Sequence, residues 1–110
     1  MLTDTEIRDL ILRTAARMKA EILQDIADGV VPADVGSFSE LHDHVDANCY
    51  GGLCDDDCPP ELIPWHYNGD ESDEAREANP AIDRVNVIFD IVDGWLKLGR
   101  PADTEPLPAL

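Results

Sequence analysis

Two segments, near the beginning and near the end of the chain, carry apolar residues at the spacing of an α-helix. The first starts at Thr3 and Glu6, a capping-box pair, and stops before Gly29 and Pro32. Its apolar positions are Ile7, Leu10, Ile11, Ala15, Met18, Ile22 and Ile26. This pattern predicts an amphipathic helix that buries one face.

The second segment begins at Asn79 and Pro80, which are typical of an N-cap and a first helical residue. It continues to about Leu98, before Gly99. Its polar positions Asn86, Asp90, Asp93 and Lys97 fall on one stripe, and almost all its other positions are apolar. Such an apolar face is wider than one partner helix covers, so this helix is either central to the domain or part of a homodimer interface.

The segment between these helices contains a shorter capping box, Ser37 and Glu40, which predicts a short helix over residues 38–48. From residue 49 to 70 the periodicity disappears, and glycines and prolines interrupt any regular structure. Residues 71–78 can add a short acidic helical turn. The tail from 100 to 110 contains three prolines and is expected to be irregular.

These elements predict an all-α fold with a single helical domain over residues 1–99. We expect two longer helices packed antiparallel, a short helix across them, and a long irregular acidic loop at 49–70. The chain has 110 residues, of which 44% are hydrophobic, which is enough for a modest core.

The charge is strongly negative and unevenly distributed. The formal net charge is −16, from 24 acidic and 8 basic residues, and no basic residue lies between Lys19 and Arg76. This composition disfavours direct binding to nucleic acid and to anionic membranes, since both require Lys and Arg to neutralise phosphate. It favours a partner protein with a basic surface. The alternative is that the acidity reflects a source organism whose proteins are acidic in general.

The cysteines and the hydropathy predict a compartment. Three cysteines is an odd number for a secreted disulfide framework. No run of apolar residues is long enough for a membrane span, and the first twenty residues lack the apolar core of a signal peptide. We therefore expect a cytoplasmic protein in a reducing environment.

A group of potential metal ligands lies in the middle of the chain. The candidates are Cys49, Cys54, Cys58, His42 and His66. The separation of Cys54 from Cys58 is within the range of paired zinc thiolates, and a tetrahedral zinc formed with Cys49 and either histidine would hold the long loop together. If the short helix reaches residue 49, then His42, Asp46 and Cys49 share one of its faces.

The same cysteines allow two other outcomes. One is a disulfide, either Cys49–Cys54 or Cys54–Cys58. The other is a set of free or buried thiols with histidines that face solvent. Calcium is disfavoured, because Asp55, Asp56 and Asp57 are consecutive and lack the alternating spacing of an EF-hand.

Known catalytic patterns are not met. Residues 42–46 (HDHVD) resemble the His-x-His-x-Asp motif of metallo-β-lactamase-like hydrolases, but Ala47 stands where that family needs a further histidine. The sequence contains no nucleophile elbow, phosphate-binding glycine loop or zinc deaminase pattern. We therefore favour a non-enzymatic function.

A candidate partner-binding surface lies in the acidic loop. Asp55, Asp56 and Asp57 supply charge, and Trp65 and Tyr67 lie on a proline-stiffened segment with the composition of an interaction hot spot. The alternative is that the two aromatic residues cover the core of the helices.

Residues 30–48 (VVPADVGSFSELHDHVDAN) resemble a segment of small uncharacterised proteins from actinobacteria and their phages. The resemblance covers roughly the first half of the chain and carries no activity and no site residues. It implies a context, a small phage or mobile-element product that acts inside a bacterial cell.

Together these features predict a small acidic binding protein that engages a host macromolecule, with its charge imitating that of DNA as one form of this hypothesis. The alternative is a zinc-stabilised structural or regulatory module whose charge is incidental.

Overall fold

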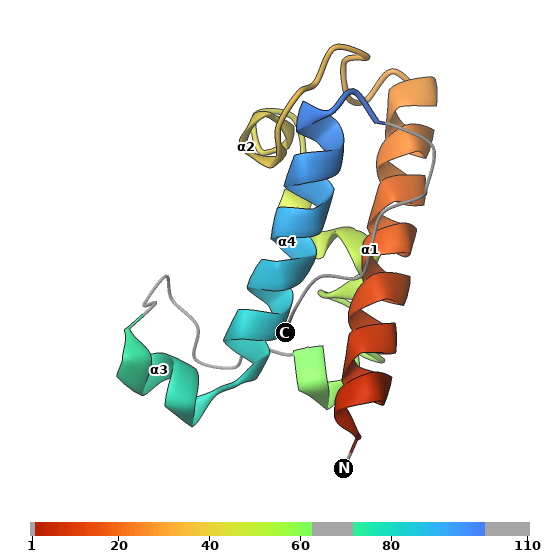
Figure 1. Cartoon of the computed structure of the whole chain (residues 1–110). Coiled ribbons are helices and arrows are strands. Elements are labelled where there is room, and N and C mark those ends of the chain that lie inside the picture. Colours follow the sequence, from red (N-terminus) through yellow and green to blue (C-terminus); the bar gives the residue numbers. More distant parts are fainter. Residues whose placement is uncertain (1, 63–71, 101–110) are drawn as a thin grey trace.

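The framework of the protein is a pair of long helices, α1 (Asp4–Ala27) and α4 (Ala81–Lys97) (Figure 1). The computed structural model describes residues 2–62 and 72–100. Within these ranges the other elements are α2 (Phe38–Leu41), α3 (Asp73–Ala78) and two 3-10 helices, η1 (Ala47–Gly52) and η2 (Pro60–Leu62). The described residues contain helices and no strand, which confirms the all-α class.

Local side-chain contacts set the ends of both long helices. At α1 the Glu6 amide donates to Thr3 Oγ1 and the Thr3 amide donates to Glu6 Oε1, each at 3.2 Å, so the expected capping box is present. At α4 the Ala81 amide donates to Asn79 Oδ1 at 3.2 Å. The start of α1 is therefore confirmed, whereas α4 begins at Ala81, one residue later than expected, with Pro80 at the N-cap position.

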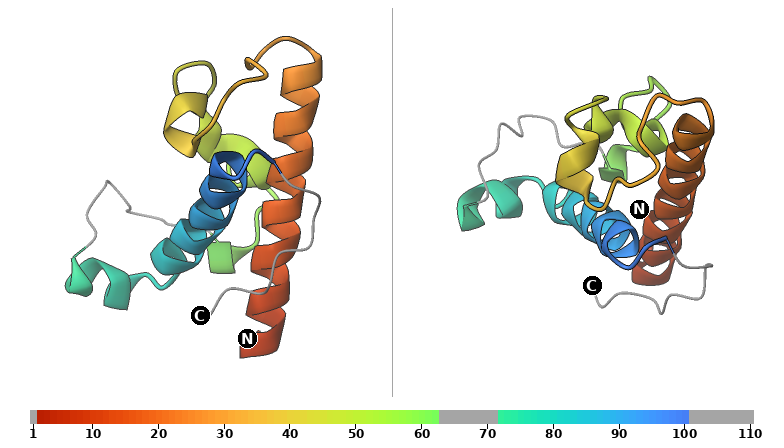
Figure 2. Two further views of the ribbon diagram at one scale, coloured as in Figure 1. Left: turned by 45° about the horizontal axis from the view of Figure 1, so that its top comes forward. Right: turned by 90° about the horizontal axis from the view of Figure 1, so that it is seen from above.

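The expected antiparallel packing of the two long helices is wrong. In Figures 1 and 2, α1 and α4 run in the same general direction and cross at an angle. Asp4 and Ile7 at the start of α1 line the same surface hollow as Asp83 near the start of α4, and Lys19 lies over Trp95 further along both helices. A short connection would force an antiparallel pair, but residues 28–80 are long enough to return the chain to the other end.

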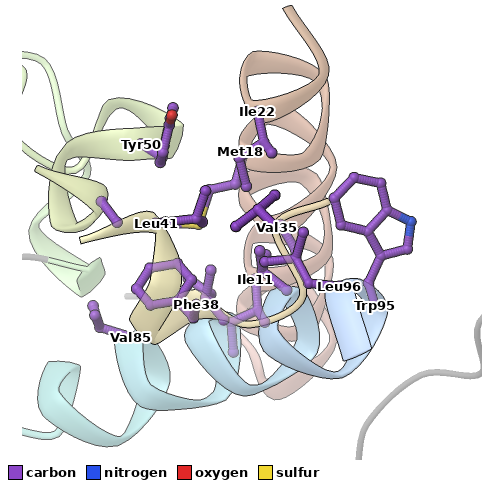
Figure 3. Close-up of a cluster of buried hydrophobic side chains, with 14 of the residues drawn as sticks. Ile11, Met18, Ile22, Val35, Phe38, Leu41, Tyr50, Val85, Trp95 and Leu96 are labelled. Carbon is purple, nitrogen blue, oxygen red and sulfur yellow. The ribbon is translucent and has the colours of Figure 1, made fainter. Parts of the chain in front are cut away.

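The core lies between these helices and the segment that connects them. Its fully buried side chains include Ile11, Met18 and Ile22 from α1, and Ile88, Val92 and Leu96 from α4, with Leu41 of α2 and Leu62 of η2 (Figure 3). Helix α4 contacts α1, α2, α3 and η2. Its wide apolar face is thus explained by a central position in the domain, and the homodimer interface stays a prediction.

The predicted helix over 38–48 is too long. Helix α2 ends at Leu41, and residues 42–46 form turns before η1 begins. The residues after Leu41 are rich in Asp and His, which are weak helix formers, and Asp side chains also favour turns. His42, Asp46 and Cys49 therefore do not share a face of one helix, and the 49–70 loop is divided by η1 and η2 within its described part.

Polar contacts attach the connecting segment to α4. The Phe38 amide donates to Asp93 Oδ1 at 2.9 Å, and Lys97 Nζ lies 2.7 Å from Asp93 Oδ2. The hydrogen bond from Lys97, together with that from Phe38, lowers the pKa of Asp93. Further along, Arg84 donates to the Glu61 carbonyl at 3.3 Å. Asp93 of the polar stripe therefore holds α2 in place, and Arg84, which lies outside that stripe, contacts η2.

Within residues 2–62 and 72–100, no helix is both long enough and apolar enough to cross a membrane.

Two leucines near the end of α4 provide a matched test of the core. Leu96 is 2% exposed and Leu98 is 75% exposed. We expect Leu96→Ala to lower the free energy of unfolding by about 2–5 kcal/mol, because it leaves a cavity between α1 and α4. The same truncation at Leu98 is expected to change it by less than about 0.5 kcal/mol. Urea unfolding followed by circular dichroism measures both, and equal losses would contradict the described core.

Candidate functional site

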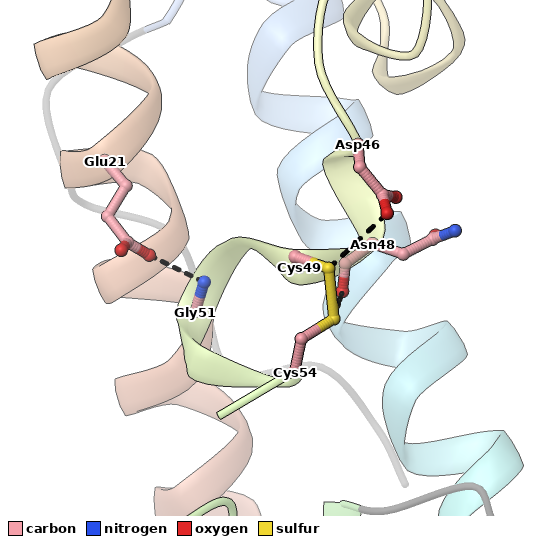
Figure 4. The surroundings of a disulfide bond; sticks show 6 residues. All are labelled: Glu21, Asp46, Asn48, Cys49, Gly51 and Cys54. Atoms are coloured by element: carbon pink, nitrogen blue, oxygen red, sulfur yellow. Dashed lines mark hydrogen bonds between the residues drawn. A yellow bond between two sulfur atoms is a disulfide. The ribbon is translucent and has the colours of Figure 1, made fainter. Parts of the chain in front are cut away.

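A disulfide between Cys49 and Cys54 closes a short loop. The loop lies in the stretch between Lys19 and Arg76 that has no basic residue, which we call the acidic tract. The Cα atoms of Cys49 and Cys54 lie 4.9 Å apart, within the range that a disulfide spans. Both half-cystines are exposed, and Figure 4 shows them on the side of the loop that faces away from Glu21 of α1. This pairing is one of the two that the sequence favours.

The other side of the loop is fastened to α1 by hydrogen bonds. The Gly51 amide donates to Glu21 Oε1 at 2.6 Å (Figure 4). The Tyr50 hydroxyl donates to Asp25 Oδ2, and the Tyr50 side chain is buried. Two carboxylates of α1, those of Glu21 and Asp25, are therefore acceptors for the loop.

The loop approaches α1 too closely for a side chain at Gly51. A Cβ atom there would lie 2.9 Å from Met18 Cγ and 3.0 Å from Thr14 Cγ2. Gly51 also has a φ of +75°, in the left-handed region that favours glycine. Glycine is thus required twice at this position, for its backbone conformation and for the contact with α1.

Arg17 of α1 covers the next part of the loop. Its guanidinium lies 3.2 Å from Asp55 Oδ2 and 3.8 Å from Glu21 Oε1, and a Cβ atom at Gly52 would collide with it. The ion pair is about half exposed, so solvent screens it and its net contribution is below about 1 kcal/mol. Its main effect is to place Asp55 beside α1.

Exposed aspartates lie close to both half-cystines, in space or in the sequence. Asp46 Oδ2 lies 3.5 Å from Cys49 Sγ. Asp55, Asp56 and Asp57 follow Cys54 directly, and all four of these aspartates are exposed. We call the surface formed by Asp46, Asp55, Asp56 and Asp57 the acidic loop surface.

The third cysteine is separate from the other two. Cys58 is a free thiol buried in the apolar core cluster. Burial raises its pKa, and the nearby Asp55 and Asp57 raise it further. A buried thiol with a raised pKa is a poor nucleophile, so Cys58 acts here as an apolar core residue.

The candidate metal ligands are not brought together in the part of the chain that the structure describes. Cys49 and Cys54 are bonded to each other, Cys58 is buried, and the His42 ring packs edge-on against Phe38. No group of three or more His, Cys, Asp or Glu side chains in residues 2–62 and 72–100 could hold a metal ion. His66 lies outside these residues. Zinc stays a prediction, and it requires reduced cysteines because thiolates are the ligands.

The candidate partner-binding residues divide in the same way. Asp55, Asp56 and Asp57 are exposed next to the disulfide, whereas Trp65 and Tyr67 lie outside the described residues.

Several basic side chains of the protein are occupied by its own groups. Arg13 pairs with Asp9 at 2.8 Å, Arg76 pairs with Asp83 at 3.1 Å, and Lys97 pairs with Asp93. Lys19 is buried, with its ammonium 5.6 Å from the centroid of a Trp95 ring. Among the described side chains, Arg17 is a basic group that pairs with the acidic loop surface, through Asp55.

Sequence analysis missed the α1 residues that receive the loop. Arg17, Glu21 and Asp25 are spaced four residues apart, and therefore form a polar row beside the buried face of α1. The Gly51-Gly52 pair between two cysteines is a signal of close backbone approach. Neither signal indicates that the row and the glycines contact each other.

Comparison of the chain with models of protein families, with curated proteins and with solved structures finds no match.

Two glycines with similar backbone angles test the contact between the loop and α1. Gly51 and Gly29 have φ values of +75° and +78°, but a Cβ atom at Gly29 would meet nothing within 4 Å. We expect Gly29→Ala to lower the free energy of unfolding by about 1–2 kcal/mol through backbone strain alone. Gly51→Ala should cost more, because Met18 must also move. Urea unfolding compares the two variants, and equal costs would show that the loop does not press on Met18.

The hydrogen bond between Tyr50 and Asp25 predicts a pH dependence of stability. Burial, and then the Asp25 carboxylate, raise the pKa of Tyr50 well above its usual 10.0. The unfolded chain therefore loses this proton first, so the contribution of Tyr50 is complete below about pH 10 and declines as the pH rises further. Urea unfolding between pH 8 and pH 11 should show a steeper loss of stability in the parent protein than in Tyr50→Phe.

A direct titration supplies the control for this prediction. Tyr67→Phe leaves Tyr50 as the sole tyrosine, so the ultraviolet absorbance of phenolate reports on it alone. The phenolate band should stay weak above pH 10 while the chain is folded. A midpoint near the ordinary tyrosine value would contradict the buried contact.

Proposed function

We propose that this protein is a small non-enzymatic binding protein that engages a basic surface of a host macromolecule through its acidic loop surface. The proposal rests on the exposure of two carboxylates, those of Asp56 and Asp57, and on their lack of a cationic partner in the described residues. Asp56 and Asp57 are exposed and, within residues 2–62 and 72–100, form no ion pair. Charges left in this state repel each other, and a cationic partner relieves that repulsion.

The segment that leads directly to Asp56 and Asp57 is restrained on both sides of Cys54. The disulfide closes residues 49–54, and Arg17 lies against Asp55. A surface that is restrained before binding loses less conformational entropy when a partner docks. Restraint therefore supports a role in recognition, where an unrestrained acidic segment would favour a purely solvating role.

Electrostatics determines the expected kinetics. Opposite charge on the partner accelerates association and selects against anionic partners, while the remaining affinity comes from contacts that exclude water. Imitation of the charge of a DNA backbone is one form of this proposal, in which the partner is a nucleic-acid-binding protein. We place the interaction in the bacterial cytoplasm, in keeping with the context implied by residues 30–48.

The test begins with immobilised protein and a bacterial lysate, followed by identification and purification of the captured protein. Association rates are then measured for the purified pair at low and at high ionic strength. We expect Asp56→Asn with Asp57→Asn to reduce the association rate by roughly tenfold at low salt, with a smaller effect when salt screens the charges. Asp55 is left unchanged in this variant because it pairs with Arg17.

A matched control removes the same charge elsewhere. Asp73→Asn with Glu74→Gln neutralises two exposed acids at the start of α3. If this control slows association as much as the loop variant, net charge and not the acidic loop surface governs binding. An association rate that is independent of salt would contradict the electrostatic mechanism.

A further inference from the structure

We propose that the Cys49–Cys54 disulfide is a reducible latch, and that its reduction by a thiol releases residues 51–54 from α1 while Tyr50 and the helical core stay in place. This inference goes beyond the proposed function and does not depend on it, because every measurement below is made on the isolated protein.

The disulfide is accessible to an external thiol. Both half-cystines are exposed, and the disulfide faces away from the contact between Gly51 and Glu21 (Figure 4). A thiolate must approach a disulfide sulfur directly, and no part of the described core stands in its way here. Exposed disulfides are the labile ones, and in a reducing compartment they are typically transient and redox-sensing.

Each sulfur of the disulfide has a hydrogen-bond acceptor nearby that a thiol can use after reduction. A disulfide has no S–H group, yet Asp46 Oδ2 lies 3.5 Å from Cys49 Sγ and the Asn48 carbonyl oxygen lies 4.0 Å from Cys54 Sγ. After reduction each thiol has an acceptor within reach for its proton. The reaction balances as one disulfide and two external thiols giving the Cys49 and Cys54 thiols and one external disulfide.

The closed ring of residues 49–54 limits the conformations of Gly51 and Gly52 and so helps to hold the loop against α1. Gly51 and Gly52 both have positive φ, at +75° and +77°. Glycine has many alternative conformations in an open chain, and a closed ring excludes most of them. When the disulfide is broken, the two glycines regain conformational entropy. Only the hydrogen bond from Gly51 to Glu21 and the ion pair of Arg17 with Asp55 then hold residues 51–54 against α1. Both contacts are polar and only partly buried, so we expect them to stabilise the docked loop by less than the conformational entropy that it regains.

The seam between α1 and α4 is formed without the disulfide. The seam between α1 and α4 is formed by buried residues such as Ile11, Ile88 and Val92, which lie outside the loop. Cys49 and Cys54 are absent from the buried core cluster, and Tyr50, which belongs to that cluster, stays attached to Asp25 of α1. Release of the loop uncovers Met18, which is fully buried and would meet a Cβ atom at Gly51. Reduction is therefore expected to act locally.

The experiment measures hydrogen exchange of the Gly51 amide by nuclear magnetic resonance in the oxidised protein and after reduction with dithiothreitol. We expect Gly51 exchange to accelerate by roughly tenfold or more on reduction, while amides in the middle of α1 and α4 keep their protection. Far-ultraviolet circular dichroism should show unchanged helix content. Reoxidation should restore the slow exchange at Gly51.

Two variants separate the latch from other effects of the reductant. Cys49→Ser with Cys54→Ser should show the fast Gly51 exchange without any reductant. Cys58→Ser should retain the full response to dithiothreitol, because Cys58 is not part of the disulfide. Unchanged Gly51 exchange after reduction would overturn the latch. Loss of helix protection together with Gly51 protection would overturn it as well, because the disulfide would then support the whole fold.

Discussion

The apolar seam between α1 and α4 is the interaction on which the rest of this structure depends. Helix α2 and η2 rest on α4, and η1 rests on α1, so each part of the connecting segment needs one of the two long helices as its support. Buried Met18 and Ile22 of α1 and Leu96 of α4 are representative of this seam. The chain contains few aromatic residues, and most of its hydrophobic free energy therefore comes from branched aliphatic side chains.

Local signals in the sequence predict the elements of the fold well, and non-local ones do not. Thr3 and Asn79 act through hydrogen bonds within a few residues, so the starts of α1 and α4 are readable from a short stretch of sequence. The direction of packing depends instead on how residues 28–80 return the chain, which no short stretch encodes. The end of α2 at Leu41 is only partly predictable from the sequence. The Asp- and His-rich residues that follow disfavour a helix, but the capping box before them favours one.

The acidic tract has two roles that its composition does not distinguish. Glu21, Asp25 and Asp55 are used within the molecule, as partners of Gly51, Tyr50 and Arg17 respectively. Other exposed carboxylates remain directed to solvent around the disulfide. A count of charges predicts the field of the molecule, but the division into internal and external charge depends on contacts between segments distant in sequence. For the same reason the cysteine spacing leaves open which pair bonds, and the structure selects Cys49 and Cys54.

The parallel course of α1 and α4 has a consequence for how the chain folds. The two helices can pack only when residues 28–80 form a closed loop between them. The conformational entropy lost in this loop closure opposes the folding step that forms the core. The disulfide joins residues five positions apart, so it shortens this closed loop very little. Collapse of the helix pair should then proceed at a similar rate whether or not the sulfurs are bonded. A newly synthesised chain can reach its core with free thiols, and the sulfur chemistry can follow on an already assembled scaffold.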